Sequence, residues 1–219
     1  MEKYSRSLFL FRRDLRVPDN TGLIEASVAS ETVVPSFVFD PQQASRNPYF
    51  SLNAFQFMIE SLQDLTRQLE AEGCFLAIFR GRSEAVVERL IEERGIEAVF
   101  VNRDYTPFSR KRDASMAKLC EDKGVAFHCC SDVLLHEPGD ILKDDGRPYT
   151  IFSHFFRKAR SIPVRPVNAA RVNNLSNLRI PPEQNEMRDY DLQDQNAQRF
   201  IPGAASARSA CWPASVRSV

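Results

Sequence analysis

The chain lacks a surplus of either charge, because 29 basic and 29 acidic side chains give its 219 residues a formal net charge of zero. A neutral chain has no global attraction for nucleic acid or for an anionic membrane, so such binding would need a local patch. It also lacks any apolar run near the length of about 20 residues that crosses a bilayer, and its polar start does not read as a signal peptide. We therefore expect a soluble, cytoplasmic protein without a membrane partner.

Sequence patterns for metal binding and for hydrolysis are missing as well. The five cysteines are odd in number and none forms a CxxC pair, which argues against a disulfide framework and against a zinc site. The three histidines do not stand at helical ligand spacing. No GxSxG, GxxxxGK[ST] or GxGxxG pattern occurs. The sequence alone thus assigns no catalytic residue and no metal ligand, and it indicates reduced, mostly buried thiols.

What the first part of the chain contains is a regular alternation of strand-like and helix-like segments. Apolar runs predict strands, and amphipathic runs between them predict helices. The expected strands are residues 7–11, 32–39, 75–79, 98–101 and 125–129, and the expected helices are 21–30, 48–72, 83–94 and 106–123. This alternation predicts an α/β fold: a five-stranded parallel, doubly wound (Rossmann-like) sheet in the order 3-2-1-4-5, with helices on both faces.

Several single residues refine this expectation. Asn20 or Asp19 is expected to cap the first helix, Ser83 the third, and Thr106, followed by proline, the fourth. Pro35 lies inside the second expected strand. Because proline cannot donate a ladder hydrogen bond, we expect it at the strand start or at a bulge.

The composition divides the chain into three parts. Residues 1–135 form the α/β unit. Residues 136–182 are expected to be a loop, an aromatic-rich helix over 149–160, and an extended basic connector rich in proline. Residues 183–219 turn acidic and then rich in small residues, so we expect a mostly disordered, truncated tail.

The predicted sheet has a ligand-binding edge where the chain order reverses, between strands one and four. Charged loops border this edge after both strands, over Arg12–Arg16 and Asn102–Tyr105. Arg12 is the functional choice in the first loop, although Arg13 and Asp14 can also form a purely structural pair.

Other side chains near this edge have two interpretations. Asp40 and Asp104 end strands two and four, where each either caps the following turn or binds the polar rim of a flat ligand. Phe37 either stacks on that ligand or packs in the core. Arg110 and Arg112 are two apart on one helix, so at most one faces the crevice. The candidate ligand-binding residues are Arg12, Phe37, Asp40, Asn53, Asp104 and Arg110.

Four blocks in this order resemble the signatures of the photolyase/cryptochrome family. They are Leu8–Arg16 with Asp19–Asn20; Phe37–Pro41; Asn102–Pro107 with Arg110, Arg112 and Asp113; and Gly146–Tyr149 with Phe152 and Phe155. Together they cover roughly residues 8–158. The chain is thereby identified as a member of this family through its N-terminal α/β domain.

The resemblance implies a specific division of labour. In the family this domain holds an antenna pigment, which is a folate, a deazaflavin or a flavin mononucleotide (FMN). The pigment passes excitation to a reduced FAD in a separate helical C-terminal domain, which binds damaged DNA, takes the pyrimidine dimer out of the stack and repairs it by electron transfer. Since this chain stops before that FAD domain, we expect it not to be catalytic alone.

The sequence also departs from the family pattern. Phe108 and Ser109 stand where folate-binding members have an Asn–Glu pair, which favours a deazaflavin or FMN over folate. Ser153 and His154 stand where many members have Thr–Pro, so the contact with the helical domain is expected to differ. The alternative functions are a nucleotide- or flavin-binding α/β module without a light function, and a non-functional fragment.

Overall fold

The computed structural model of the chain describes residues 3–40 and 51–177. Its strands form one parallel sheet with the order β3-β2-β1-β4-β5, which confirms the predicted topology. The strands are β1 (Tyr4–Phe11), β2 (Ser30–Phe39), β3 (Ala77–Arg80), β4 (Ala98–Asn102) and β5 (Ala126–Cys130). The predicted helix start at residues 48–50 and the predicted tail over 183–219 lie outside the described residues.

Four of the helices of the described residues lie between consecutive strands, whereas the last of them follows the final strand. The described helices are α1 (Thr21–Ala29), α3 (Leu52–Ala71), α4 (Ser83–Arg94), α5 (Pro107–Asp122) and α6 (Phe152–Ala159). The Asn20 side chain accepts the Leu23 N–H and Thr106 accepts the Ser109 N–H, as the sequence predicts. The expected cap Ser83 is wrong by one residue, because Arg82 occupies the N-cap and Ser83 is already helical and buried.

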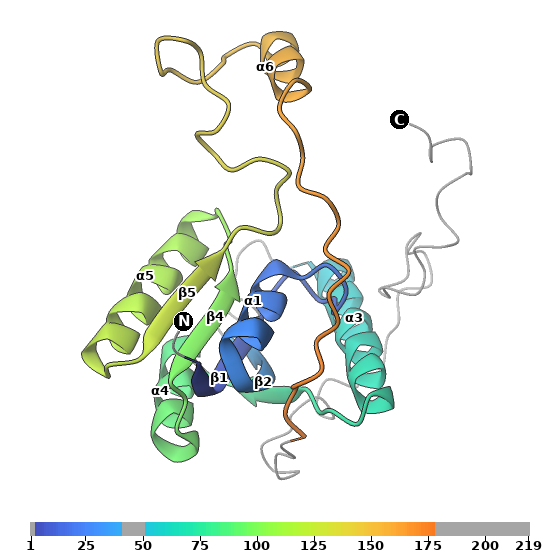
Figure 1. The fold of residues 1–219 in the computed structure, drawn as a ribbon, viewed down its shortest axis with the longest axis vertical. Helices are drawn as coiled ribbons and strands as arrows, with labels where there is room; N and C mark the ends of the chain where they lie inside the picture. Colours follow the sequence, from blue (N-terminus) through green and yellow to red (C-terminus); the bar gives the residue numbers. More distant parts are fainter. Residues whose placement is uncertain (1–2, 41–50, 178–219) are drawn as a thin grey trace.

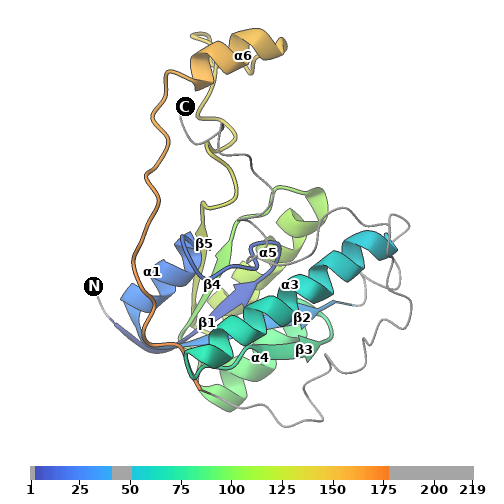
Figure 2. The same cartoon turned by 90° about the vertical axis from the view of Figure 1, so that its right-hand side faces the viewer.

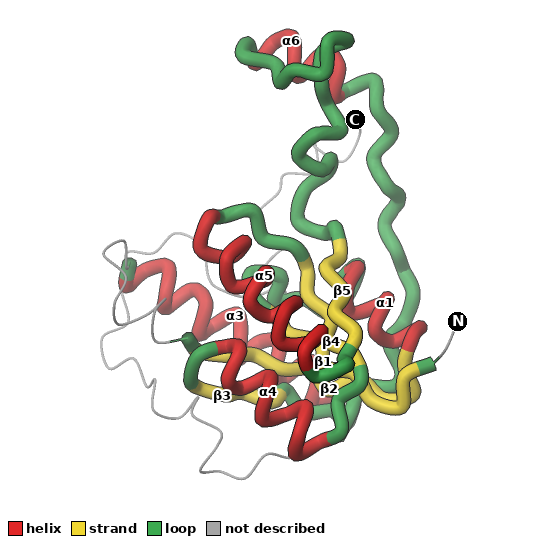
Figure 3. Tube along the Cα trace, turned by 90° about the vertical axis from the view of Figure 1, so that its left-hand side faces the viewer, coloured by secondary structure: helices red, strands yellow, loops and turns green. Residues whose placement is uncertain are grey.

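The sheet is buried on both faces by two separate apolar layers. Phe9, Phe11 and Phe100 pack in a cluster with α1 and α3, whereas Leu8 and Val99 pack in a second cluster with α4 and α5. Neighbouring residues of a strand point to opposite faces, so each strand contributes to both layers. Figure 3 shows α4 and α5 on one side of the sheet and α1 on the other. This arrangement confirms the doubly wound fold.

Pro35 lies in the middle of β2, opposite Phe9, rather than at a strand start or bulge. The Val33 N–H donates to the Asn174 carbonyl and the Val33 carbonyl accepts the Ser176 N–H, at 3.0 and 2.7 Å, so this part of β2 is bordered by the returning chain instead of β3. The backbone nitrogen of Pro35 points to the same edge of β2 as that of Val33, because successive residues of a strand alternate in direction. Since β3 begins to pair only at Ser36, no ladder bond is lost at Pro35.

Residues 131–177 extend away from the sheet and then return to it. Figures 1 and 2 show α6 at the far end of this excursion, while the returning segment runs down alongside α1 to β2. There the Asn174 amide donates to the carbonyls of Ser27 and Ser30 at 3.0 and 2.8 Å. The predicted aromatic helix is shorter than expected, and none of its residues is buried by the described chain. No described helix combines the length and apolarity that crossing a membrane requires.

Candidate functional site

The carboxyl ends of β1 and β4 lie side by side, because the two strands pair directly. From β1 the chain turns into α1 on one face of the sheet, and from β4 it turns into α5 on the other face. The edge between them is the switch point at which α/β sheets bind ligands. Arg12 follows β1 and Asp104 follows β4, so both lie at this one edge as the sequence predicts.

Arg12 is bound by a carboxylate of α5. Its Nη1 donates to Oδ2 of Asp113 at 2.9 Å, and its Nη2 lies 2.8 Å from Oδ1 of the same carboxylate. Arg112 also reaches this carboxylate, through Nε at 3.2 Å. Each of the two arginine side chains is only 8% exposed. The sequence singled out Arg110, which is exposed, whereas Arg112 is the arginine of this helix that joins the cluster.

The Asp104 carboxylate accepts hydrogen bonds from residues at the start of α5 and also lies close to an arginine. Its Oδ1 accepts the Thr106 N–H at 3.2 Å and its Oδ2 accepts the Ser109 hydroxyl at 2.8 Å, while Arg13 Nε lies 3.4 Å away. Burial opposes ionisation of Asp104, but these hydrogen bonds and the nearby arginines outweigh it and lower the pKa of the carboxyl group. Asp104 is therefore an anion at neutral pH that fixes the start of α5.

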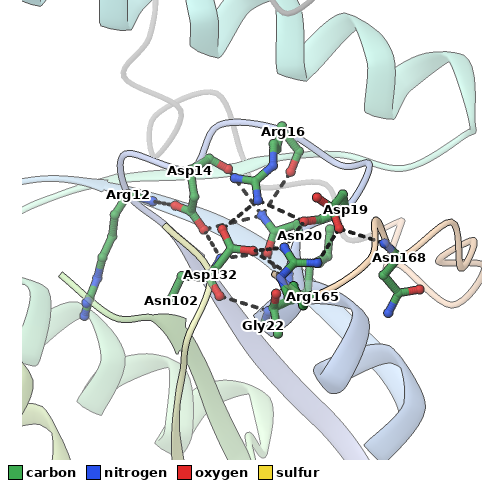
Figure 4. Close-up of polar contacts among 12 residues, drawn as sticks. Arg12, Asp14, Arg16, Asp19, Asn20, Gly22, Asn102, Asp132, Arg165 and Asn168 are labelled. Atoms are coloured by element: carbon green, nitrogen blue, oxygen red, sulfur yellow. Dashed lines mark hydrogen bonds and ion pairs between the residues drawn. The ribbon is translucent and has the colours of Figure 1, made fainter. Parts of the chain in front are cut away.

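A buried polar network holds the loop after β1 in place (Figure 4). Asn102, the last residue of β4, accepts the Gly22 N–H at 2.9 Å and donates to Asp14 and Asn20 at 2.6 and 2.8 Å. Asp14 also accepts the backbone N–H of Arg12 at 2.7 Å. The alternative of an Arg13–Asp14 pair does not apply to this arrangement, because Arg13 pairs with Asp104. This network fixes the backbone from which the Arg12 side chain extends.

A second set of contacts ties the returning segment to the same loop. The buried carboxylate of Asp132 accepts from Arg16 Nη2 at 2.7 Å and from the Thr21 N–H at 2.9 Å. Arg165 lies 3.5 Å from Asp132 and donates to Asp19 at 2.6 Å, while the Asn168 N–H donates to Asp19 at 2.9 Å. Figure 4 shows Arg165 between the two carboxylates. The segment after α6 is thus coupled to the loop that carries Arg12.

This coupling predicts an acid-sensitive contribution to stability. The hydrogen bond from Arg165, followed by the one from the Asn168 N–H, lowers the pKa of Asp19. A carboxyl group with a lowered pKa in the folded state stabilises the fold above its unfolded pKa, and this contribution is lost as pH falls through the folded value. From pH 6 to pH 2.5 the free energy of unfolding should therefore fall less in Asp19→Asn than in the wild type. Urea unfolding of both proteins at both pH values measures the two drops. Equal losses in the two proteins would contradict this assignment.

The remaining candidate residues lie at different depths around the edge. Phe37 is 6% exposed and belongs to the core cluster, where its ring meets Phe39 edge-on at 5.0 Å. Asp40 is buried at the end of β2, and Asn53 is exposed in the first turn of α3. Both have polar or charged contacts beyond those described above. Their roles in ligand binding remain proposals, as does that of Arg110.

Tyr105 and Glu137 connect the loops that follow β4 and β5. The Tyr105 hydroxyl donates to Glu137, which also accepts from Arg103 Nη1 at 2.8 Å. Burial and the neighbouring Glu137 carboxylate raise the pKa of Tyr105, so the hydroxyl stays protonated and remains a donor. No local sequence pattern predicts this pair, because its members are 32 positions apart.

The described residues contain no cluster of three or more histidine, cysteine or acidic side chains that could hold a metal ion. Cys74, Cys120, Cys129 and Cys130 are free thiols. Burial raises the pKa of Cys120 to about 11, which makes this thiol a poor nucleophile at neutral pH. Charged and polar side chains of the described residues gather instead at the carboxyl edge of β1 and β4.

The fold and this edge define a doubly wound α/β domain with charged and polar side chains at its switch point. The family model for DNA photolyase matches residues 7–171, and the chain therefore belongs to the DNA photolyase family. A deoxyribodipyrimidine photo-lyase of Synechococcus is 30% identical over 177 residues, which is 81% of this chain and 36% of the relative. Cryptochrome-1 of Anopheles gambiae is 33% identical over 188 residues, 80% of this chain and 34% of the relative.

Solved structures agree with this family. An archaeal photolyase from Sulfolobus tokodaii, whose crystal structure holds two FAD molecules with the implication of a novel light-harvesting cofactor, superposes with a TM-score of 0.71. It is 37% identical, and the match covers 78% of this chain and 38% of that one. The chain thus spans between a third and two fifths of the length of these relatives. The resemblance read from the four sequence blocks is confirmed.

Proposed function

We propose that this chain is the antenna-pigment-binding part of a photolyase-type protein and that it holds a flavin-type pigment at the carboxyl edge of β1 and β4. The observation that supports the proposal is the gathering of two ion pairs at the switch point of the sheet: Arg12 and Arg112 contact Asp113, and Arg13 contacts Asp104. The similarity to the Sulfolobus tokodaii photolyase, with its two FAD molecules, supports a flavin rather than a folate. The contacting residues would be Arg12, Phe37, Asp40, Asn53, Asp104 and Arg110.

In this proposal the chain collects light and leaves the chemistry to a longer protein. The pigment would absorb near-ultraviolet or blue light and transfer excitation to an FAD bound outside the matched region. Repair of pyrimidine dimers in damaged DNA would belong to that FAD-binding part. The chain alone would show no photorepair of dimer-containing DNA. The free thiols support a reducing compartment such as the cytoplasm.

Reconstitution with candidate pigments tests this function. The purified chain is mixed with FMN, FAD, riboflavin, a deazaflavin or a folate, and the pigment that co-elutes on gel filtration is read from its absorption spectrum. We expect a flavin or deazaflavin to be retained and folate to be lost. Arg12→Gln should weaken retention by about tenfold or more, because a charged hydrogen bond is removed.

Arg67→Gln serves as the control, since this arginine lies on the exposed surface of α3, where it pairs with Asp64 at 3.3 Å. Its pigment retention should equal that of the wild type. Tight binding of an adenine nucleotide without retention of any coloured pigment would contradict the antenna function and would support a nucleotide-binding function instead.

A further inference from the structure

The first half of β2 has an edge that β3 does not pair, because β3 begins to pair only at Ser36. Val33 lies in this half and is buried, so its backbone N–H and carbonyl need partners within the protein. The last carbonyls of α1, among them that of Ser27, also lack partners within the helix, and its last turn holds no basic residue. Backbone donors and acceptors therefore gather along this edge of β2, next to the end of α1.

Residues 172–176, here called the clasp, fill this edge as an added strand. The Asn174 carbonyl accepts the Val33 N–H at 3.0 Å, and the Ser176 N–H donates to the Val33 carbonyl at 2.7 Å. Leu175 thereby lies opposite Val33 in a parallel bridge. Figures 1 and 2 show how the returning segment reaches β2 alongside α1. Backbone pairing of this kind is how many proteins bind extended peptides at the edge of a sheet.

The Asn174 side chain binds the end of α1. Its amide group donates to the carbonyls of Ser27 and Ser30 at 3.0 and 2.8 Å, and its Oδ1 accepts the Ser27 hydroxyl at 2.5 Å. The two amide hydrogens and the amide oxygen thus meet two acceptors and one donor. An aspartate of the same size would lose both donors and would place a negative charge against two carbonyl oxygens. This position of the clasp is therefore specific for asparagine.

The other contacts of the clasp are apolar and equally local. Val172 and Leu175 pack against the core cluster that α1 and α3 share, and the Cys74 thiol lies 3.5 Å from the Leu175 carbonyl. Residues 163–171, which connect α6 to the clasp, are exposed. Within this connector, Arg165 contacts Asp19, which lies in the loop before α1. The clasp is thus a short bound peptide at the end of an exposed tether.

We propose that this edge of β2 is a peptide-binding site of the strand-addition type, and that the clasp is its tethered ligand, which can leave the site and be replaced. The class of ligand is an extended peptide with an asparagine directly before a leucine. The polar groups described above belong to residues 27–33 and 74, so recognition does not require the covalent link. The inference does not rest on the proposed function, because no pigment takes part in it.

A labelled synthetic peptide with the sequence of residues 171–177, RVNNLSN, is the probe in the first test. The full chain carrying both Asn174→Asp and Leu175→Asp has a disabled clasp and should bind the peptide, as measured by fluorescence anisotropy. A tether holds its ligand at an effective concentration of about 1 mM. The wild-type clasp therefore competes with the free peptide, and we expect the wild type to bind it at least about tenfold more weakly.

Asn173→Asp is the matched control, because it makes the same chemical change one residue earlier, at an exposed position. Its affinity for the peptide should equal that of the wild type. A peptide that itself carries Asn174→Asp should not bind the double variant. If the folded double variant does not bind the RVNNLSN peptide, or if all three chains bind it equally, the site is overturned.

Amide hydrogen exchange of the wild-type chain is a second test, which remains decisive if the double variant does not fold. A detachable clasp opens locally, so the N–H groups of Val33 and Ser176 should exchange together. Their exchange should be at least about tenfold faster than that of the Leu8 N–H in the central strand β1. Exchange of all three groups at one slow rate would mean that the clasp leaves only when the whole domain unfolds, and would overturn the proposal.

Discussion

Replacement of Asn102 by alanine is expected to lower the free energy of unfolding by about 3–5 kcal/mol. The Asn102 amide is a partner of three groups, the Gly22 N–H and the side chains of Asp14 and Asn20. All three residues are buried, so water cannot easily replace the lost contacts. A buried donor or acceptor without a partner costs about 1–3 kcal/mol, and more when it is charged, as Asp14 is.

Urea unfolding of Asn102→Ala measures this loss, and Asn168→Ala is the matched control. Asn168 is exposed, and its side chain accepts the Ala170 N–H at 3.0 Å in the returning segment. We expect less than about 1 kcal/mol from the control, as for other exposed hydrogen bonds. If both variants lost the same small amount, the network of Figure 4 would not stabilise the fold as described.

The strand order followed from the sequence because it depends on short-range patterns. Apolar runs alternate with helical stripes, and the handedness of crossovers leaves few topologies. Pro35 shows where this reasoning stops. Its position within β2 is acceptable only because the chain near Asn174 replaces β3 along that part of the strand. That contact joins segments about 140 positions apart, which no local rule describes.

The candidate site could be predicted only in part, because local sequence patterns place residues along the chain but do not show which distant residues they contact. Charged residues directly after buried strands indicate the ligand edge, and this pattern identified Arg12 and Asp104. Arg112 was not chosen, because spacing on α5 does not tell which of two arginines turns inward. Asn102 and Asp132 were missed as network centres, since Asn102 lies 80 positions from Gly22 and Asp132 lies 111 positions from Thr21.

The exposed aromatic face of α6 shows that a sequence pattern can predict a helix without showing what packs against it. Phe152 and Phe156 stack at 5.7 Å, yet they are 73% and 48% exposed. A stripe of aromatic residues on a helix usually packs against another element. The described part of this chain supplies no such element, so the sequence pattern defined the helix correctly but not its surroundings.

Replacement of Asp113 by asparagine is expected to cost about 3–5 kcal/mol of unfolding free energy, as large as the effect at Asn102. The substitution keeps the size of the side chain but leaves Arg12 and Arg112 buried without their shared carboxylate. Two like charges in a poorly hydrated place repel strongly, because the surroundings screen them less than water does. Urea unfolding of the purified variant at neutral pH gives the loss directly.

A second substitution tests whether Arg12 and Arg112 repel each other in the absence of the Asp113 charge. Arg112→Gln removes one of the two arginines and relieves the repulsion from Arg12, so alone it should cost no more than about 1.5 kcal/mol. Combined with Asp113→Asn it should restore part of the lost stability, and the double variant should be more stable than Asp113→Asn alone. Additive losses would mean that Arg12 and Arg112 do not repel each other when Asp113 is neutral.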